Sequence, residues 1–211
     1  MTESEWLVCA DPIPMLNELR KNANERKLRL FFCACCRGVH YTICLQGLEA
    51  VGVAEAYADG LVTETVRAAT QRQIQALIPE ESDWSAYSLI AWALQVGKSY
   101  PLDYVMMWAI PNVIRVGLVT DGEVTSKLRD IFGPRPFRKI EIESSLLAWN
   151  CRTVLNLAQT IYEKNAFDLL PILADALEEA GCEQEDLLHH CRDKTDHVRG
   201  CWVIDHLLNK N

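Results

Sequence analysis

The chain is a succession of apolar segments with the periodicity of an α-helix, and this pattern constrains its fold most. In residues 26–45 apolar side chains cover most of the helix circumference, which predicts a central helix buried on nearly all sides. Glycine, proline and polar turns separate this segment from its neighbours. Further helices are expected at residues 12–19, 48–58, 63–77, 84–96, 101–110, 120–131, 149–163, 167–180, 183–192 and 197–208.

Short connections between these helices favour an all-α fold, either an irregular multi-helix bundle or a short helical solenoid. Residues 140–143 (Ile-Glu-Ile-Glu) alternate like a strand, so at most one very short strand pair is expected. Pro111 is expected to kink or break the helix in which it falls, because it lacks a backbone donor.

One irregular stretch, Gly133-Pro134-Arg135-Pro136, divides the chain. We therefore expect an N-terminal helical region at residues 1–132, a connecting loop at 133–143 and a C-terminal helical region at 144–211. The two regions are expected to pack together as one compact domain.

The charge balance argues against nucleic acid as a partner. The net charge is −8 and the isoelectric point is near 5.2, whereas phosphate backbones are bound by clustered Lys and Arg. Residues 20–37 carry six basic residues and one acid, and residues 163–186 carry eight acids and one base. Two solvated helix faces would explain this asymmetry, and so would a bipolar surface that docks a partner or a second copy.

No export or membrane segment is expected. The N-terminus has neither a basic region nor an apolar core. The most apolar stretch, residues 102–118, is interrupted by charges and proline and is shorter than the roughly 20 residues of a membrane span. Nine cysteines, an odd number with three crowded at 33–36, do not form a disulfide framework, so reduced thiols in a cytoplasm are predicted.

The candidate metal ligands are Cys182, Cys191, His197 and Cys201, in the pattern Cys-x8-Cys-x5-His-x3-Cys. His197 and Cys201 are four residues apart and would share one face of a helix. Two ligands from a helix and two from flanking turns could close a structural zinc site. The alternative is that the thiols are small core side chains and that His197 bonds a backbone carbonyl, because this chain has enough apolar residues to build a core without metal.

A second thiol group, Cys33, Cys35, Cys36 and Cys44, admits a redox or copper interpretation, but the neighbouring phenylalanines favour packing. The sequence has no nucleophile elbow, phosphate-binding glycine loop, His-Glu-x-x-His motif or dinucleotide fingerprint. No catalytic or cofactor-binding residue is therefore predicted.

The two ends of the chain resemble a family of uncharacterised bacterial proteins that is abundant in planctomycetes. The resemblance is carried by Trp6, Cys9, Asp11-Pro12, Met15-Leu16 and residues 26–31, 129–133, 136–138, 170–182 and 197–205. It implies a bacterial cytosolic helical protein without an assigned activity. Relatives carry an apolar residue at the position of Cys191, which argues against a four-ligand site that includes this residue.

The sequence thus predicts a non-catalytic helical protein that binds another protein or a second copy of itself. One alternative is a zinc-stabilised helical domain, and another is an enzyme whose site the sequence does not reveal. No membrane partner is expected.

Overall fold

The computed structural model describes residues 1–20, 24–39, 43–78, 85–95, 108–134, 137–138 and 140–210. These residues form an all-α fold, and none of them lies in a β-strand. The alternating residues 140–143 form no strand, which agrees with at most one very short strand pair: Ile140 is buried, but 140–143 is irregular and leads directly into a helix. Within the described ranges no helix combines the length and the hydropathy that a membrane span needs.

The chain divides into two compact units, Met1–Arg129 and Asp130–Asn211. The N-terminal unit contains α1 (Glu3–Val8), α2 (Pro12–Leu19), α3 (Glu25–Gly38), α4 (Leu45–Ala58), α5 (Glu64–Gln75), α6 (Ala86–Gln95), α8 (Ile110–Arg115) and most of α9 (Asp121–Phe132). The C-terminal unit begins in the last turn of α9. It continues through α10 (Ser144–Lys164), the 3-10 helix η3 (Phe167–Leu169), α11 (Leu170–Glu179), α12 (Glu185–Arg192) and α13 (Trp202–Leu207).

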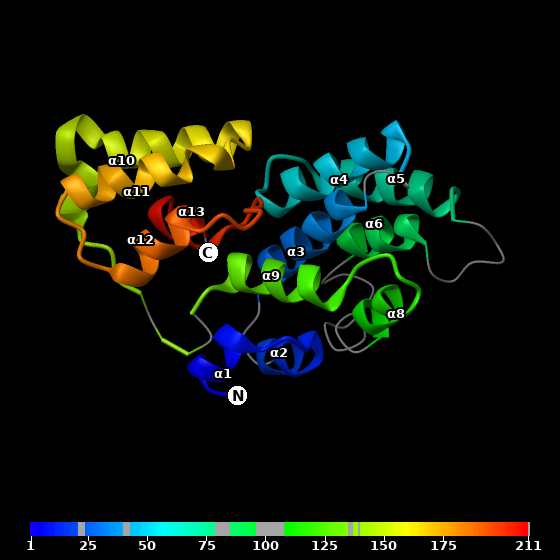
Figure 1. The fold of residues 1–211 in the computed structure, drawn as a ribbon. Helices are drawn as coiled ribbons and strands as arrows, with labels where there is room; N and C mark the ends of the chain where they lie inside the picture. Colours follow the sequence, from blue (N-terminus) through cyan, green and yellow to red (C-terminus); the bar gives the residue numbers. More distant parts are fainter. Residues whose placement is uncertain are drawn as a thin grey trace. The chain divides into compact units, whose positions relative to one another are not determined.

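In the N-terminal unit α3 packs against α4 and α6, and α5 packs against the same two helices (Figure 1). Asn24 caps α3 by accepting a hydrogen bond from the Lys27 amide. From Lys27 to Cys36 every side chain is buried, as predicted for a central helix. The helix ends at Gly38 rather than near Leu45, and Leu45 is already the first residue of the next helix.

Two buried arginines close the C-terminal end of α6. Arg29 Nη1 donates to the Ala93 carbonyl at 2.5 Å, and Arg67 Nη1 donates to the Leu94 carbonyl at 2.6 Å. The last carbonyls of a helix have no partner within the helix, so buried donors stabilise them. Both guanidinium groups also lie over the Tyr57 ring. Part of the basic segment at residues 20–37 is therefore committed to contacts inside its own unit.

The expected helix starts agree with the structure at several points. Asp11 caps α2, with Pro12 in its first turn, and α5 begins directly after Thr63. Pro111 lies in the first turn of α8, where its missing donor costs nothing. The helix expected at 101–110 falls mostly on residues outside the described ranges, as do both ends of the one expected at 84–96.

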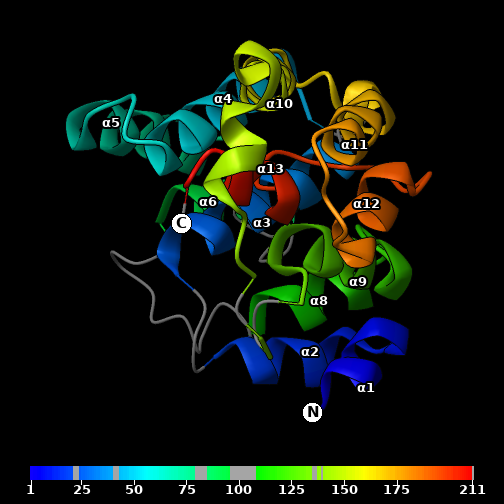
Figure 2. The ribbon, with the colours of Figure 1, turned by 90° about the vertical axis from the view of Figure 1, so that its left-hand side faces the viewer.

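In the C-terminal unit α11 packs between α10 and α12, and α13 packs against α10 and α12 (Figures 1 and 2). α10 begins five residues earlier than expected and is interrupted at Trp149–Arg152. Three consecutive residues there, Asn150, Cys151 and Arg152, have positive φ. The core of this unit contains aliphatic side chains together with Trp202, Tyr162 and three cysteines.

Candidate metal centre

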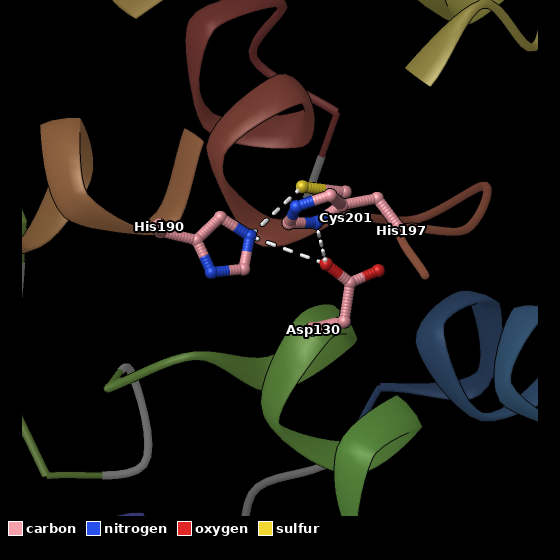
Figure 3. A group of neighbouring side chains, drawn as sticks. All are labelled: Asp130, His190, His197 and Cys201. Carbon is pink, nitrogen blue, oxygen red and sulfur yellow. Dashed lines mark hydrogen bonds and ion pairs between the residues drawn. The ribbon is translucent and has the colours of Figure 1, made fainter. Parts of the chain in front are cut away.

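Four side chains of the C-terminal unit bring their ligand atoms to within 4.8 Å of one another: Asp130, His190, His197 and Cys201 (Figure 3). They come from the end of α9, the last turn of α12, the irregular segment before α13 and the N-cap of α13. It is the single such group of three or more among the residues that the structure describes. Residues from three separate stretches of chain are thus held around one point.

Asp130 lies at the centre of the hydrogen bonds. Its Oδ1 is 2.6 Å from His197 Nδ1 and 3.2 Å from His190 Nε2, and its Oδ2 accepts the Val198 amide at 2.8 Å. Burial alone would raise the pKa of this carboxyl, but the hydrogen bonds from His190 and His197 outweigh it and lower the pKa to about 2. Asp130 is therefore an ionised carboxylate in a buried position.

The two histidines differ in what surrounds them. The side chain of His197 is 4% exposed; burial lowers its pKa, but the Asp130 carboxylate reverses this and raises the pKa above the ordinary value. Its Nε2 is buried and makes no hydrogen bond to any residue that the structure describes. His190 is the most open of the four, with 16% of its side chain exposed, and its Nε2 is 3.2 Å from the Cys201 sulfur.

Cys201 is fully buried at the start of α13. Burial, with the nearby Asp130 carboxylate, raises the pKa of its thiol well above the ordinary value. A thiol in this setting keeps its proton unless a cation replaces it, and a metal ion does so by direct bonding.

His190 is not placed as the base of a nucleophile relay, and His197 Nε2 makes no hydrogen bond to the Cys201 thiol. In such a relay the carboxylate binds one nitrogen of the histidine and the nucleophile faces the other. Here Cys201 and Asp130 both lie at Nε2 of His190. Convergence on one nitrogen, together with a raised thiol pKa, fits shared coordination of an ion better than activation of a nucleophile.

Packing around the cluster positions its residues. Trp202, which follows Cys201, lies with its ring 5.1 Å from the His190 ring, and the two histidine rings meet edge to face at 4.8 Å. Gly133 has a positive φ and lies so close to the Trp202 indole that a Cβ there would be 2.5 Å from it. Arg199 and Lys210 both lie 4.4 Å from the centre of the Tyr162 ring, which ties the segment before α13 to the end of the chain.

Of the four ligands expected from sequence, the structure brings His197 and Cys201 into this group. Cys182 and Cys191 lie in the hydrophobic core of the same unit and are not members of the group. Burial, with the nearby Cys182 thiol, raises the pKa of Cys191 to about 12.

The helical argument for His197 and Cys201 is wrong, although the two residues do meet. The helix expected at 197–208 begins only at Trp202, because the backbone of the Cys201 N-cap is not helical and Gly200 has a positive φ. His197 therefore lies in an irregular segment and not one turn before Cys201 on a helix face.

Sequence reasoning missed Asp130 and His190 as members of this group. His190 is adjacent to Cys191, which was predicted instead, and nothing in the local sequence distinguishes Asp130 from other helical acids. The thiols of Cys33, Cys35 and Cys36 are buried, and burial raises the pKa of Cys35 to about 12, which supports packing rather than redox chemistry.

Comparison with protein-family models, curated proteins and solved structures gives no match. The resemblance to uncharacterised bacterial proteins therefore stays a prediction, and the chemistry of the site has to be argued from this chain's own residues.

Proposed function

We propose that the C-terminal unit is a metal-binding module that holds one divalent transition-metal ion within the group formed by Asp130, His190, His197 and Cys201. The observation that carries this proposal is the convergence of one carboxylate, two imidazoles and one thiol to within 4.8 Å. Mixed nitrogen, oxygen and sulfur donors suit zinc best among the common ions. The other functional expectations, a bacterial cytoplasmic location among them, stay proposals.

Zinc at this position would stabilise a segment that has little regular structure of its own. The connection from α12 to α13 is irregular, and within it the Val198 amide is bonded to Asp130. At a free zinc concentration 100 times the dissociation constant, binding would stabilise the folded unit by about 2.7 kcal/mol.

The test is a zinc titration of the full chain after the metal has been removed, in competition with a chromophoric chelator. We expect one equivalent to bind and the thermal midpoint to rise. Cys201→Ala and His197→Ala should abolish tight binding, whereas Cys182→Ala and Cys191→Ala should keep the stoichiometry at one. Loss of binding in the second pair but not in the first would exclude the ligand set proposed here.

A binding role for the N-terminal unit is a second proposal, and exposed apolar side chains on α1 support it. Leu7 is 54% exposed and Val8 is 82% exposed. Adjacent exposed aliphatic residues favour contact with a protein partner or with a second copy of the chain. Light scattering of the wild type and of a Leu7→Ser/Val8→Ser variant tests self-association. A wild type that stays monomeric at high concentration would exclude binding to a second copy.

A further inference from the structure

The geometry at His197 limits how many protein atoms can bind one ion. With zinc bonds of 2.0–2.1 Å to nitrogen and oxygen, two ligands of a tetrahedron are roughly 3.3 Å apart. His197 Nδ1 and Asp130 Oδ1 are 2.6 Å apart, which is a hydrogen-bond distance. Only one of these two atoms can therefore be a ligand while the pair stays as it is.

The remaining separations do fit a shared ion. For one nitrogen and one sulfur ligand the expected separation is roughly 3.5 Å. His190 Nε2 and the Cys201 sulfur are 3.2 Å apart, within a few tenths of that value. His190 Nε2 and Asp130 Oδ1 are also 3.2 Å apart, so this pair alone does not decide whether Asp130 binds the ion directly.

The second nitrogen of His197 decides the question. If Asp130 were the ligand, Nε2 of His197 would stay buried without a hydrogen-bond partner, which costs about 1–3 kcal/mol. If Nε2 binds the ion, Nδ1–H keeps its hydrogen bond to the carboxylate, an arrangement common among metal-binding histidines. Figure 3 shows the Nε2 side of the ring turned away from Asp130, on the side of the Cys201 sulfur.

We infer that the ion has three protein ligands, His190 Nε2, His197 Nε2 and Cys201 Sγ, and one open position. Asp130 is then a positioning residue: Oδ1 orients His197 and Oδ2 holds the Val198 amide. This inference rests on the proposed metal-binding function and goes beyond it, because a closed four-ligand site is structural whereas an open one binds a further ligand.

The exposure of the four side chains indicates from which side a further ligand would approach. Asp130 and His197 side chains are 3% and 4% exposed, and Cys201 is fully buried. His190 is 16% exposed and is the most open of the four, so we expect an incoming group to approach beside it. The space next to a buried cation takes water or a small anion with an oxygen or nitrogen donor, which becomes the fourth ligand.

The experiment uses the full chain loaded with one equivalent of cobalt(II), whose visible absorption reports coordination, titrated with azide. We expect bands typical of four-coordination, a sulfur-to-cobalt band in the near ultraviolet, and a saturable spectral change with azide. Cys201→Ala should remove the sulfur band, and Cys191→Ala should keep it. A cobalt spectrum that azide does not change would overturn the open position but leave metal binding intact, whereas failure to bind either cobalt or zinc would overturn the proposed function itself.

Asp130→Asn separates the two roles of the carboxylate. As a positioning residue it should lower the affinity for zinc about 10- to 100-fold while the azide response persists. An azide response that is absent in the wild type and appears only in Asp130→Asn would show that Asp130 is the fourth ligand. Because the wild-type titration already tests the open position, the inference does not depend on the stability of this variant.

Discussion

Replacement of Gly133 by alanine should weaken the packing around the candidate metal centre without changing any of its four side chains. A Cβ at this position would lie 2.5, 2.6 and 2.7 Å from three atoms of the Trp202 indole, and Trp202 is 2% exposed. The positive φ of Gly133 adds about 1–2 kcal/mol for any residue with a Cβ. Overpacking against a buried ring costs a further 1–3 kcal/mol or so, which gives a total of about 2–5 kcal/mol.

The matched control is Gly181→Ala, which also has a positive φ but meets nothing within 4 Å of the added Cβ. It should cost only the conformational part, about 1–2 kcal/mol. Hydrogen exchange at residues 144–210 in increasing urea measures both variants within the C-terminal unit. Because the indole contacts the His190 ring, Gly133→Ala should also weaken zinc binding. Equal losses of unfolding free energy in the two variants would refute the argument that the Cβ at residue 133 overpacks against Trp202.

Three further predictions follow from the buried and exposed ionisable groups. Arg29→Met removes the donor to the Ala93 carbonyl and should lower the free energy of unfolding by about 1.5–3 kcal/mol in urea titrations, whereas full stability would contradict the role given to this arginine. Cys44 is exposed at the N-cap of α4, and hydrogen bonds from the Tyr87 hydroxyl and the Gly47 amide lower its pKa. The rate of its modification by iodoacetamide should therefore rise with a midpoint pH below the ordinary value of roughly 8.5, and Tyr87→Phe should raise that midpoint pH. The folded pKa of Asp130, about 2, lies below the unfolded value of roughly 3.9, so this carboxylate stabilises the metal-free fold above pH 4 or so and the contribution is lost as the pH falls towards 2. The stability of Asp130→Asn should therefore depend less on pH between about 4 and 2 than that of the wild type. An identical pH profile of unfolding in the two proteins would contradict the lowered pKa of Asp130.

Helical periodicity and capping residues predicted the fold class, because they act over a few residues that the sequence displays directly. Asp11-Pro12 and Thr63 mark helix starts correctly, and the segment from Lys27 to Cys36 is buried as expected. Helix ends were harder to predict. The apolar pattern continues after Gly38 and predicts more helix, but α3 ends there and α4 begins at Leu45.

The candidate metal centre could be predicted only in part, because its residues are distant in sequence. The spacing of His197 and Cys201 predicted that they lie together, yet they meet through an irregular segment and not on one face of a helix. Asp130 is 67 residues from His197, and only the packing of the unit brings the two together. Cys191 fitted the spacing pattern equally well, but it lies in the hydrophobic core while its neighbour His190 contributes to the group.

The Tyr162 ring has a practical consequence for anyone who purifies this protein. Since Lys210 and Arg199 both lie over the Tyr162 ring, and Arg199 is two residues after His197, we expect an affinity tag at the carboxyl end to disturb the segment that carries His197. A polyhistidine tag there would also compete for the ion being measured. Tags belong at the amino end, with a cleavable linker, before any metal stoichiometry is determined.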